Sequence, residues 1–428
     1  MATLEKLATG YEDKLLACIH CGLCLEACPT YVITGNENDG PRGRLYLMRA
    51  VAEGRLEKTS EAFATHIDRC LGCRACEQAC PAGVEYGQLL EASREVLLEA
   101  QPKTDLANRL LRFVLRHVWV SRGRLRMFFG ASRLFRDMGL ARLLLKFRLL
   151  PSRLKFGVAL LESSKGVFNA KAQRGKVAGQ AESVMLFEGC IGEGLFAHVN
   201  RATERVLEAN HFEVKTPSEP VCCGALHAHA GDLEGARELA RKNIAAFESD
   251  APIVTNAGGC GAMLATYGHL FANDEGLAEK AAKFSARVRD VSQQLATVEM
   301  RMAPSPAQTA VTYDTSCHLM YGQRSGEASE RMLRSVAGKD FVALNGTERC
   351  CGAAGVYNLL QPEMSQRVLK EKLDHIKETG ATILATGNPG CQMHIGAGAC
   401  LSGMKLRICH PIEIVDQAYQ EAGYYDGR

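Results

Sequence analysis

The chain has 428 residues, of which 46% are hydrophobic and 23% are charged, and its net charge is +3 at neutral pH. This composition excludes a mostly disordered, collagen-like or coiled-coil protein, and the length predicts two to four domains. We find no run of about 18 apolar residues that would predict a membrane-spanning helix, and residues 1–14 lack the apolar stretch of a secretory signal. We therefore expect a cytoplasmic protein. Its 18 cysteines then point to metal binding or catalysis, because a reducing compartment disfavours disulfides.

Two runs of four cysteines near the N-terminus share the spacing C-x2-C-x2-C-x3-C-P, and the second run follows the first by 52 residues. This is the spacing of bacterial ferredoxins with two [4Fe–4S] clusters, in which the fourth cysteine of each run binds the other cluster. Zinc is disfavoured, because zinc sites usually take two ligand pairs separated by a longer loop. We therefore predict one cluster on Cys18, Cys21, Cys24 and Cys80, and a second cluster on Cys70, Cys73, Cys76 and Cys28.

The insert between the two runs contains Gly40-Pro41-Arg42-Gly43-Arg44, followed by a predicted helix over 45–56. Two interpretations of its arginines stay open at this stage. Arg42 and Arg44 either hydrogen-bond near a cluster or dock a partner, or they belong to a solvated turn.

A strongly basic segment follows over 106–160, which contains 13 arginines and lysines and a single acid, Asp137. Leucine, phenylalanine and one tryptophan alternate with the basic residues at helical spacing. A basic amphipathic helix of this kind is typical of proteins that bind an anionic membrane surface. Docking on a partner subunit explains the pattern equally well, whereas nucleic acid is disfavoured because no nucleic-acid-binding module is present. Small polar residues over 163–182 predict a linker.

The second half alternates short predicted strands with predicted helices, which indicates βαβ units with parallel sheets. Strands are expected over 183–187, 212–214 and 252–255, and again over 310–313, 341–344 and 381–385. Helices are expected over 232–248 and 362–378. Cysteines follow these strands in the same order twice, at offsets of 127–131 residues, which indicates a duplication.

Each half of this duplication carries a Cys-Cys-Gly motif and two further cysteines. Loops at the carboxyl ends of parallel strands converge, so we expect one site at Cys190, Cys222, Cys223 and Cys260, and another at Cys317, Cys350, Cys351 and Cys391. Adjacent cysteines reach one site only from a bent loop, which Gly224 and Gly352 permit. Thiolate-rich sites select iron–sulfur clusters or zinc. Buried structural cysteine and a vicinal disulfide are the remaining alternatives.

These motifs together resemble the glycolate oxidase iron–sulfur subunit family, with relatives among lactate utilisation proteins, heterodisulfide reductases and the iron–sulfur proteins of anaerobic glycerol-3-phosphate dehydrogenase. The match rests on the doubled cysteine run, residues 40–44, Asn388-Pro389-Gly390-Cys391 and His410-Pro411-Ile412-Glu413. Heterodisulfide reductases often carry one more cysteine, separated by two residues from the last cysteine of the module, at positions where this chain has Met263 and His394. That departure speaks against their five-cysteine cluster.

The resemblance implies a multidomain α+β and α/β protein. We expect a helical two-[4Fe–4S] domain over 1–100, a basic helical segment and linker over 101–182, and Cys-Cys-Gly modules over 183–303 and 304–428. It further implies that flavoprotein partner subunits oxidise glycolate, or alternatively lactate or glycerol 3-phosphate. FAD would lie on those subunits, because clusters carry single electrons and the chain has no dinucleotide fingerprint. Electrons would then pass to a quinone at the inner face of the cytoplasmic membrane.

Two other functions remain open from the sequence. The Cys-Cys-Gly sites could catalyse thiol–disulfide reduction directly, or the chain could be a non-redox zinc scaffold. The first predicts a substrate-dependent spectroscopic change in the single chain, and the second predicts zinc without iron.

Overall fold

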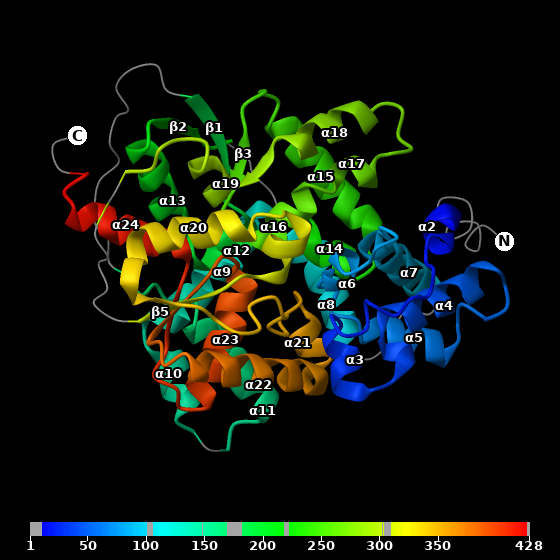
Figure 1. Cartoon of the computed structure of the whole chain (residues 1–428). Helices are drawn as coiled ribbons and strands as arrows, with labels where there is room; N and C mark the ends of the chain where they lie inside the picture. The colour runs from blue at the N-terminus through cyan, green and yellow to red at the C-terminus, as the bar shows by residue number, and fades with distance from the viewer. Residues whose placement is uncertain are drawn as a thin grey trace.

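The computed structural model describes residues 11–100, 106–147, 149–168, 182–217, 222–301, 303 and 310–425. Most of the predicted linker, 169–181, lies outside this range. A helical N-terminal part occupies one end of the molecule, and two α/β modules form most of the rest (Figure 1). No helix in the described ranges is both long enough and apolar enough to cross a bilayer.

Short helices build the N-terminal domain around a core that includes Met48, Phe63 and Leu89. They are α2 (Glu12–Leu16), α3 (Pro29–Thr34), α4 (Pro41–Ala52), α5 (Glu61–Asp68), α6 (Ala75–Gln78) and α7 (Tyr86–Ala100), with a 3-10 turn η1 (Glu37–Asp39). The interpretation of residues 40–44 as a solvated turn is wrong. Pro41 starts α4, as its fixed φ favours, and Gly43 is buried where an added Cβ would lie 2.2 Å from the Glu37 carbonyl oxygen.

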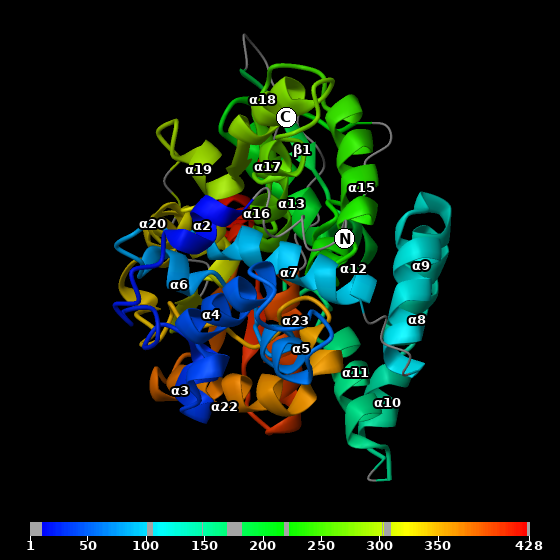
Figure 2. The ribbon, with the colours of Figure 1, turned by 90° about the vertical axis from the view of Figure 1, so that its right-hand side faces the viewer.

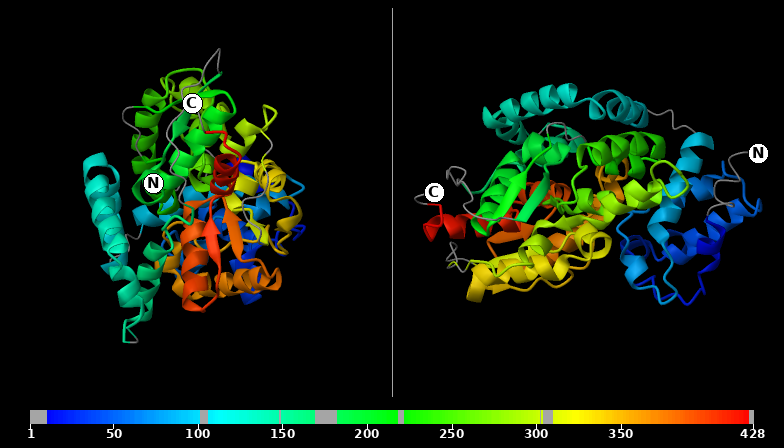
Figure 3. Two further views of the ribbon diagram at one scale, coloured as in Figure 1. Left: turned by 90° about the vertical axis from the view of Figure 1, so that its left-hand side faces the viewer. Right: turned by 90° about the horizontal axis from the view of Figure 1, so that it is seen from above.

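The basic segment forms a column of helices along one side of the molecule (Figures 2 and 3). Its elements are α8 (Leu106–Val114), a π-helical stretch η2 (Leu115–Trp119), α9 (Arg122–Asp137), α10 (Leu140–Leu145) and α11 (Ser152–Glu162). Two contacts hold α9 on the first module. The Phe129 ring covers Gly194, where a Cβ would lie 2.4 Å from it. Buried Arg136 donates to the carbonyl oxygen of Leu195 in that module (3.3 Å), and also to that of Ser164, which follows α11 (3.0 Å).

The first module contains a four-stranded parallel sheet in the order β2-β1-β3-β4. Its strands are β1 (Glu182–Phe187), β2 (Phe212–Lys215), β3 (Ile253–Thr255) and β4 (Val288–Asp290). Its helices are α12 (Cys190–Leu195), α13 (Ala197–Ala209), α14 (Ala225–His229), α15 (Leu233–Ala246), α16 (Gly258–Leu264), α17 (Tyr267–Leu270), α18 (Ala278–Ala286) and α19 (Val291–Leu295).

The second module repeats this topology with the strand order β6-β5-β7-β8. Its strands are β5 (Val311–Asp314), β6 (Phe341–Val342), β7 (Ile383–Thr386) and β8 (Arg407–Cys409). Its helical elements are η3 (His318–Gly322), α20 (Gly326–Ala337), η4 (Gly338–Asp340), α21 (Tyr357–Leu360), α22 (Pro362–Glu378), α23 (Pro389–Leu401) and α24 (Pro411–Glu421). The equal strand order confirms the predicted duplication.

The two modules share one hydrophobic core rather than meeting as separate domains. Val206 on α13, Leu333 on α20 and Tyr419 on α24 all belong to it. A bidentate ion pair also crosses the boundary, because Arg205 donates to both carboxylate oxygens of Asp416 at 2.9 and 2.6 Å. The modules are therefore held in one fixed orientation, which also fixes the distance between their cysteine sites.

Candidate iron–sulfur centres

The first predicted cluster site is a cavity at the surface of the N-terminal domain. Cys18, Cys21, Cys24 and Cys80 all line it, together with apolar side chains that include Leu45 and Val84. Cys21 is exposed, and the other three thiols are half-buried. Burial raises the pKa of the Cys24 thiol to about 11, and the neighbouring Cys18 and Cys80 raise it as well. Thiols that repel one another as thiolates fit a bound cation centre, which relieves that repulsion.

The two cysteine loops have the same backbone shape. Residues at the second and fourth positions after the first cysteine take positive φ in both: His20 (56°) and Gly22 (85°), and Gly72 (62°) and Arg74 (64°). Left-handed residues turn the backbone so that three thiols of one loop face one centre. Non-glycine residues in this region are strained, and such strain is found mainly where function requires the geometry.

The second predicted site lies deeper. Cys28, Cys70 and Cys76 are buried, and Cys28 and Cys70 are close enough to Cys73 and Cys76 to raise the pKa of both thiols. The structure thus places the fourth cysteine of the first run beside three cysteines of the second run. That exchange is the arrangement predicted from the spacing.

Arg44 supplies a buried positive charge at this second site. Its side chain is 1% exposed and donates to Cys28 Sγ (3.8 Å), Thr30 Oγ1 (3.0 Å) and the His66 carbonyl oxygen (2.7 Å). Burial opposes its charge, but nearby Cys70, Tyr86 and Cys28 raise its pKa above the ordinary value. The buried Asp39 carboxylate lies 4.0 Å from Arg44 but also pairs with Arg69 (3.1 Å), so thiolates that hold a cluster would add negative charge beside this buried guanidinium.

The four predicted cysteines of each module converge, with the same contacts in both modules. In the first module Cys190 Sγ lies 3.5 Å from Cys222 Sγ, and Cys223 Sγ lies 3.4 Å from Cys260 Sγ. In the second module the corresponding distances are 4.0 Å (Cys317 to Cys350) and 3.1 Å (Cys351 to Cys391). All eight are free thiols. Two sets of four converging sulfur atoms are donor sets that a soft metal or an iron–sulfur centre takes.

The predicted bends after the adjacent cysteines are present. Gly224 and Gly352 have φ of +89° and +91°. The backbone N–H of Gly224 donates to Cys222 Sγ (3.5 Å), and that of Gly352 donates to Cys350 Sγ (3.4 Å). This turn lets two consecutive thiols face the same centre, which a straight strand does not allow.

The second module's cysteine site lies directly against the N-terminal domain. Leu71, Cys73, Cys317 and Cys350 belong to one apolar cluster. Burial raises the pKa of the Cys73 thiol well above its usual range, and Cys317 is the next contributor. The second ferredoxin-type site and the second module's site are therefore neighbours, although the sequence separates them by more than 240 residues.

One asparagine links the cysteine sites of the two modules. Asn388 Nδ2 donates to Cys391 Sγ (3.4 Å), while Asn388 Oδ1 accepts from the backbone N–H of Gly259 (3.0 Å), next to Cys260. The backbone N–H of Gly258 also donates to the Gly387 carbonyl oxygen (3.0 Å). His229 and His318 add a second contact, with ring centroids 5.6 Å apart. No sequence motif predicted these contacts.

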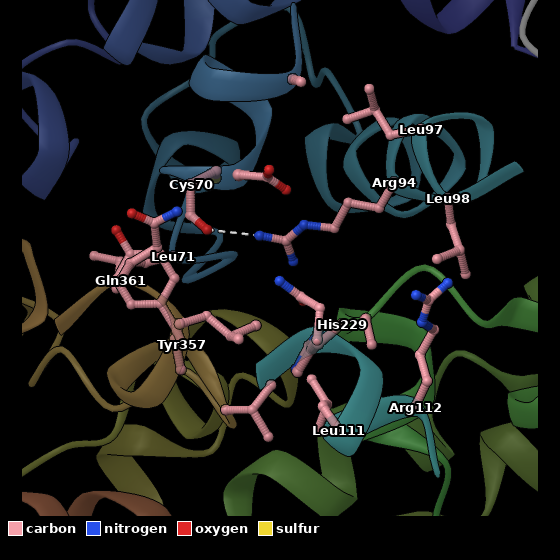
Figure 4. A pocket seen from close by; sticks show the side chains of 17 residues that line it. Cys70, Leu71, Arg94, Leu97, Leu98, Leu111, Arg112, His229, Tyr357 and Gln361 are labelled. Atoms are coloured by element: carbon pink, nitrogen blue, oxygen red, sulfur yellow. Dashed lines mark hydrogen bonds between the residues drawn. The ribbon is translucent and has the colours of Figure 1, made fainter. Parts of the chain in front are cut away.

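A pocket lies where the N-terminal domain, α8 and both modules meet (Figure 4). Its lining includes Arg94, Leu111, His229 and Tyr357. Arg94 donates to the Cys70 carbonyl oxygen (2.6 Å), and the Tyr357 hydroxyl donates to the Arg69 carbonyl oxygen (2.8 Å). The first bond ties the second cysteine loop to α7 within the N-terminal domain, and the second holds it against the second module.

Comparison with known proteins agrees with this geometry. The model of a 4Fe-4S dicluster domain matches residues 14–84, and that of a cysteine-rich domain matches residues 184–265 and 311–396. The chain is 35% identical over 426 residues to the probable glycolate oxidase iron–sulfur subunit of Bacillus subtilis, covering 96% of this chain and 95% of the relative. The chain belongs to the glycolate oxidase iron–sulfur subunit family. The fold class expected from the sequence is thereby confirmed.

Two further relatives give the breadth of the family. The glycolate oxidase iron–sulfur subunit of Escherichia coli is 33% identical over 418 residues, covering 96% of this chain and 95% of the relative. Lactate utilization protein A of Oceanobacillus iheyensis is 33% identical over 241 residues, which is 56% of this chain and 98% of that protein. Membership of the family makes this chain an iron–sulfur subunit of an oxidoreductase complex of the glycolate oxidase type.

Proposed function

We propose that this chain carries electrons from the flavin of a partner subunit, which oxidises glycolate to glyoxylate, to a quinone of the cytoplasmic membrane. The observation that carries the proposal is the continuity of its cysteine sites, from an exposed first site to a second site that touches the second module. When bound, iron–sulfur centres accept and release one electron at a time. The cysteines named above hold the two [4Fe–4S] clusters, and we propose a further iron–sulfur centre in each module.

The exposed cysteine loop is the proposed docking face for the flavoprotein. Ile19 is 67% exposed and Leu23 is 61% exposed, on either side of the exposed Cys21. Large apolar side chains at a surface that also bears a redox site favour a protein partner. Electrons would enter the chain here, at its most accessible site.

The basic segment is the proposed membrane-facing side. Of the 20 exposed large hydrophobic residues among the described residues, twelve lie on this segment: Leu106, Leu110, Phe113, Met127, Phe128, Leu134, Met138, Leu140, Leu143, Phe147, Leu149 and Leu154. Among its arginines, only Arg136 is buried in the described part of the segment. Exposed apolar side chains surrounded by cations fit a peripheral contact with anionic lipid.

A single substitution tests the electron path. Cys21→Ser removes one ligand of the exposed cluster, so we expect glycolate to reduce the partner's flavin at an unchanged rate while reduction of an electron acceptor is lost. Stopped-flow absorbance of the flavin and a dye-reduction assay measure the two steps separately. The control is Cys400→Ser, which removes an exposed thiol outside all four sites and should change neither. Normal acceptor reduction by the Cys21→Ser complex would refute the path.

A further inference from the structure

A second pocket lies between α9 of the basic segment and the first module, and the cysteine site forms one of its walls. Cys190 and Cys222 line it directly. Cys190 is half-buried, whereas all four cysteines of the second module's site are buried. The first module thus presents two of its cysteines to this cavity, whereas of the four described site cysteines of the second module only Cys350 borders a pocket, a smaller one against the N-terminal domain.

The opposite wall is aromatic. Trp119 and Phe129 line the pocket with their rings 5.8 Å apart in an edge-to-face arrangement, and Leu125 adds an aliphatic surface. The Trp119 indole nitrogen is buried, and within the described residues its N–H lies in hydrogen-bond reach of the Cys190 thiol, with no oxygen or nitrogen partner. An aromatic wall beside the cysteine site suits a flat, conjugated ring.

Guanidinium groups stand at the rim. Arg126 and Arg133 line the pocket, and no carboxylate of the described chain lies within ion-pair distance of either. The acids at the rim, Glu188 and Glu193, are each 2.8 Å from Arg201 and so are already paired. Arginine offers only donors, so these two side chains select a ligand with acceptor oxygens.

We propose that this pocket binds the head group of a quinone and that the first module is where electrons leave the chain. The inference rests on the proposed electron-transfer function. A ring with two carbonyl oxygens meets the aromatic wall and the donors, and its apolar tail would extend toward the exposed side chains of Met127 and Phe128 on the same helix. A water-soluble disulfide or carboxylate would use the arginines but leave the aromatic wall without a role.

The chemistry balances without another reactant. Oxidation of one 2-hydroxy acid to the 2-oxo acid on the partner releases two electrons and two protons. The two electrons arrive at the pocket one after the other, and the quinone takes up both together with two protons from solvent, which gives the quinol. The enclosed site of the second module then acts as a relay between the N-terminal clusters and the first module.

The chain offers a direct reporter, because Trp119 is its only tryptophan. Anaerobically purified chain is titrated with decylubiquinone, and binding is followed by ultrafiltration and by quenching of Trp119 fluorescence. We expect saturable binding with quenching, about tenfold weaker in Arg133→Gln because a hydrogen bond from a charged donor is lost. Val120→Phe, which fills the pocket, should abolish both signals. Arg109→Gln, on an exposed arginine outside the pocket, should change neither.

Two results would overturn this inference. One is quinone binding that Arg133→Gln and Val120→Phe leave unchanged, or no saturable binding at all. The other is quenching of Trp119 by an oxidised dithiol compound in place of the quinone. Dye reduction by the complete wild-type complex, measured in parallel, keeps the proposed function separate, because a wild-type complex that does not reduce the dye would refute the electron path whatever the quinone does.

Discussion

The two Cys-Cys-Gly modules have the same strand order and the same contacts among their four cysteines, yet different parts of the chain cover their sulfur sites. The second module's site lies against the loop of Cys73 and is fully buried. The first module's site opens to a pocket beneath α9. The duplicated fold therefore provides two similar cysteine sites, and the segments packed around them distinguish the site that we propose as an internal relay from the site that we propose meets the acceptor.

The largest expected effect comes from removing one cysteine in each module. Cys350→Ser and Cys222→Ser should both abolish quinone reduction by the complex, because each removes one centre of the proposed path. They should differ in what glycolate still reduces. In Cys222→Ser the centre of the second module becomes reduced, whereas in Cys350→Ser the first module's centre stays oxidised. Low-temperature electron paramagnetic resonance after rapid freezing distinguishes the two.

The reverse pattern would contradict this division of roles between the modules. Reduction of the first module's centre in Cys350→Ser would mean that electrons bypass the second module. Equal retention of quinone reduction in both variants would mean that neither module lies on the path.

The second largest effect is expected from breaking the ion pair that joins the modules, which should lower the stability of the fold. Asp416→Asn leaves Arg205 without its charge partner, and Asp416 is only 2% exposed. Breaking such a buried pair costs about 3 kcal/mol, which lowers the unfolding temperature by roughly 6–12 °C for a unit of this size. Differential scanning calorimetry measures the shift, and Glu421→Gln at the exposed end of the same helix is the control. An unchanged temperature would show that the shared core alone fixes the modules.

The caps of two corresponding helices should give opposite pH dependences. Asp290 caps α19 in the first module, and His410 caps α24 in the second, each in a capping box. Burial raises the pKa of Asp290 to about 6 from 3.8 and lowers the pKa of His410 to about 3 from 6.5. Folded Asp290 holds more protons than the unfolded chain between pH 4 and 6, so it makes stability fall as the pH rises through that range. Folded His410 holds fewer protons between pH 3 and 6.5, so it makes stability rise with pH.

Unfolding temperatures across these pH ranges test both signs. Asp290→Asn should gain stability relative to the wild type as the pH rises from 4 to 6, by up to about 3 kcal/mol, since the shift is near two pH units. His410→Asn should lose stability relative to the wild type as the pH rises from 3 to 6.5. Parallel curves for the wild type and both variants would show that neither cap titrates as its burial implies.

Sequence patterns located most of the elements that carry cysteines. The helix predicted over 362–378 is observed as α22 (Pro362–Glu378), and each of the eight cysteines predicted to form the module sites follows a strand as expected. Spacing sufficed there because periodicity and turn residues are local signals. The buried first turn of α4 was missed, since it depends on Gly43 lying against Glu37 and on the contact of Arg44 with the His66 carbonyl oxygen.

The sequence contains no pattern that predicts the contacts between distant parts of the chain. The proximity of Cys73 to Cys317, and the hydrogen bonds of Asn388 that link the two modules, result from how the domains pack. The pocket at Cys190 likewise depends on where α9 crosses the first module. The sequence therefore predicted which cysteines the structure brings together, and the structure added the order in which these groups of cysteines adjoin.

Electron paramagnetic resonance of the anaerobically prepared complex decides whether this chain carries the electrons. After addition of glycolate, we predict signals of reduced [4Fe–4S] clusters on this chain, which disappear when quinone is added. A chain whose iron is present but never becomes reduced by glycolate and the flavoprotein would contradict the proposed electron path.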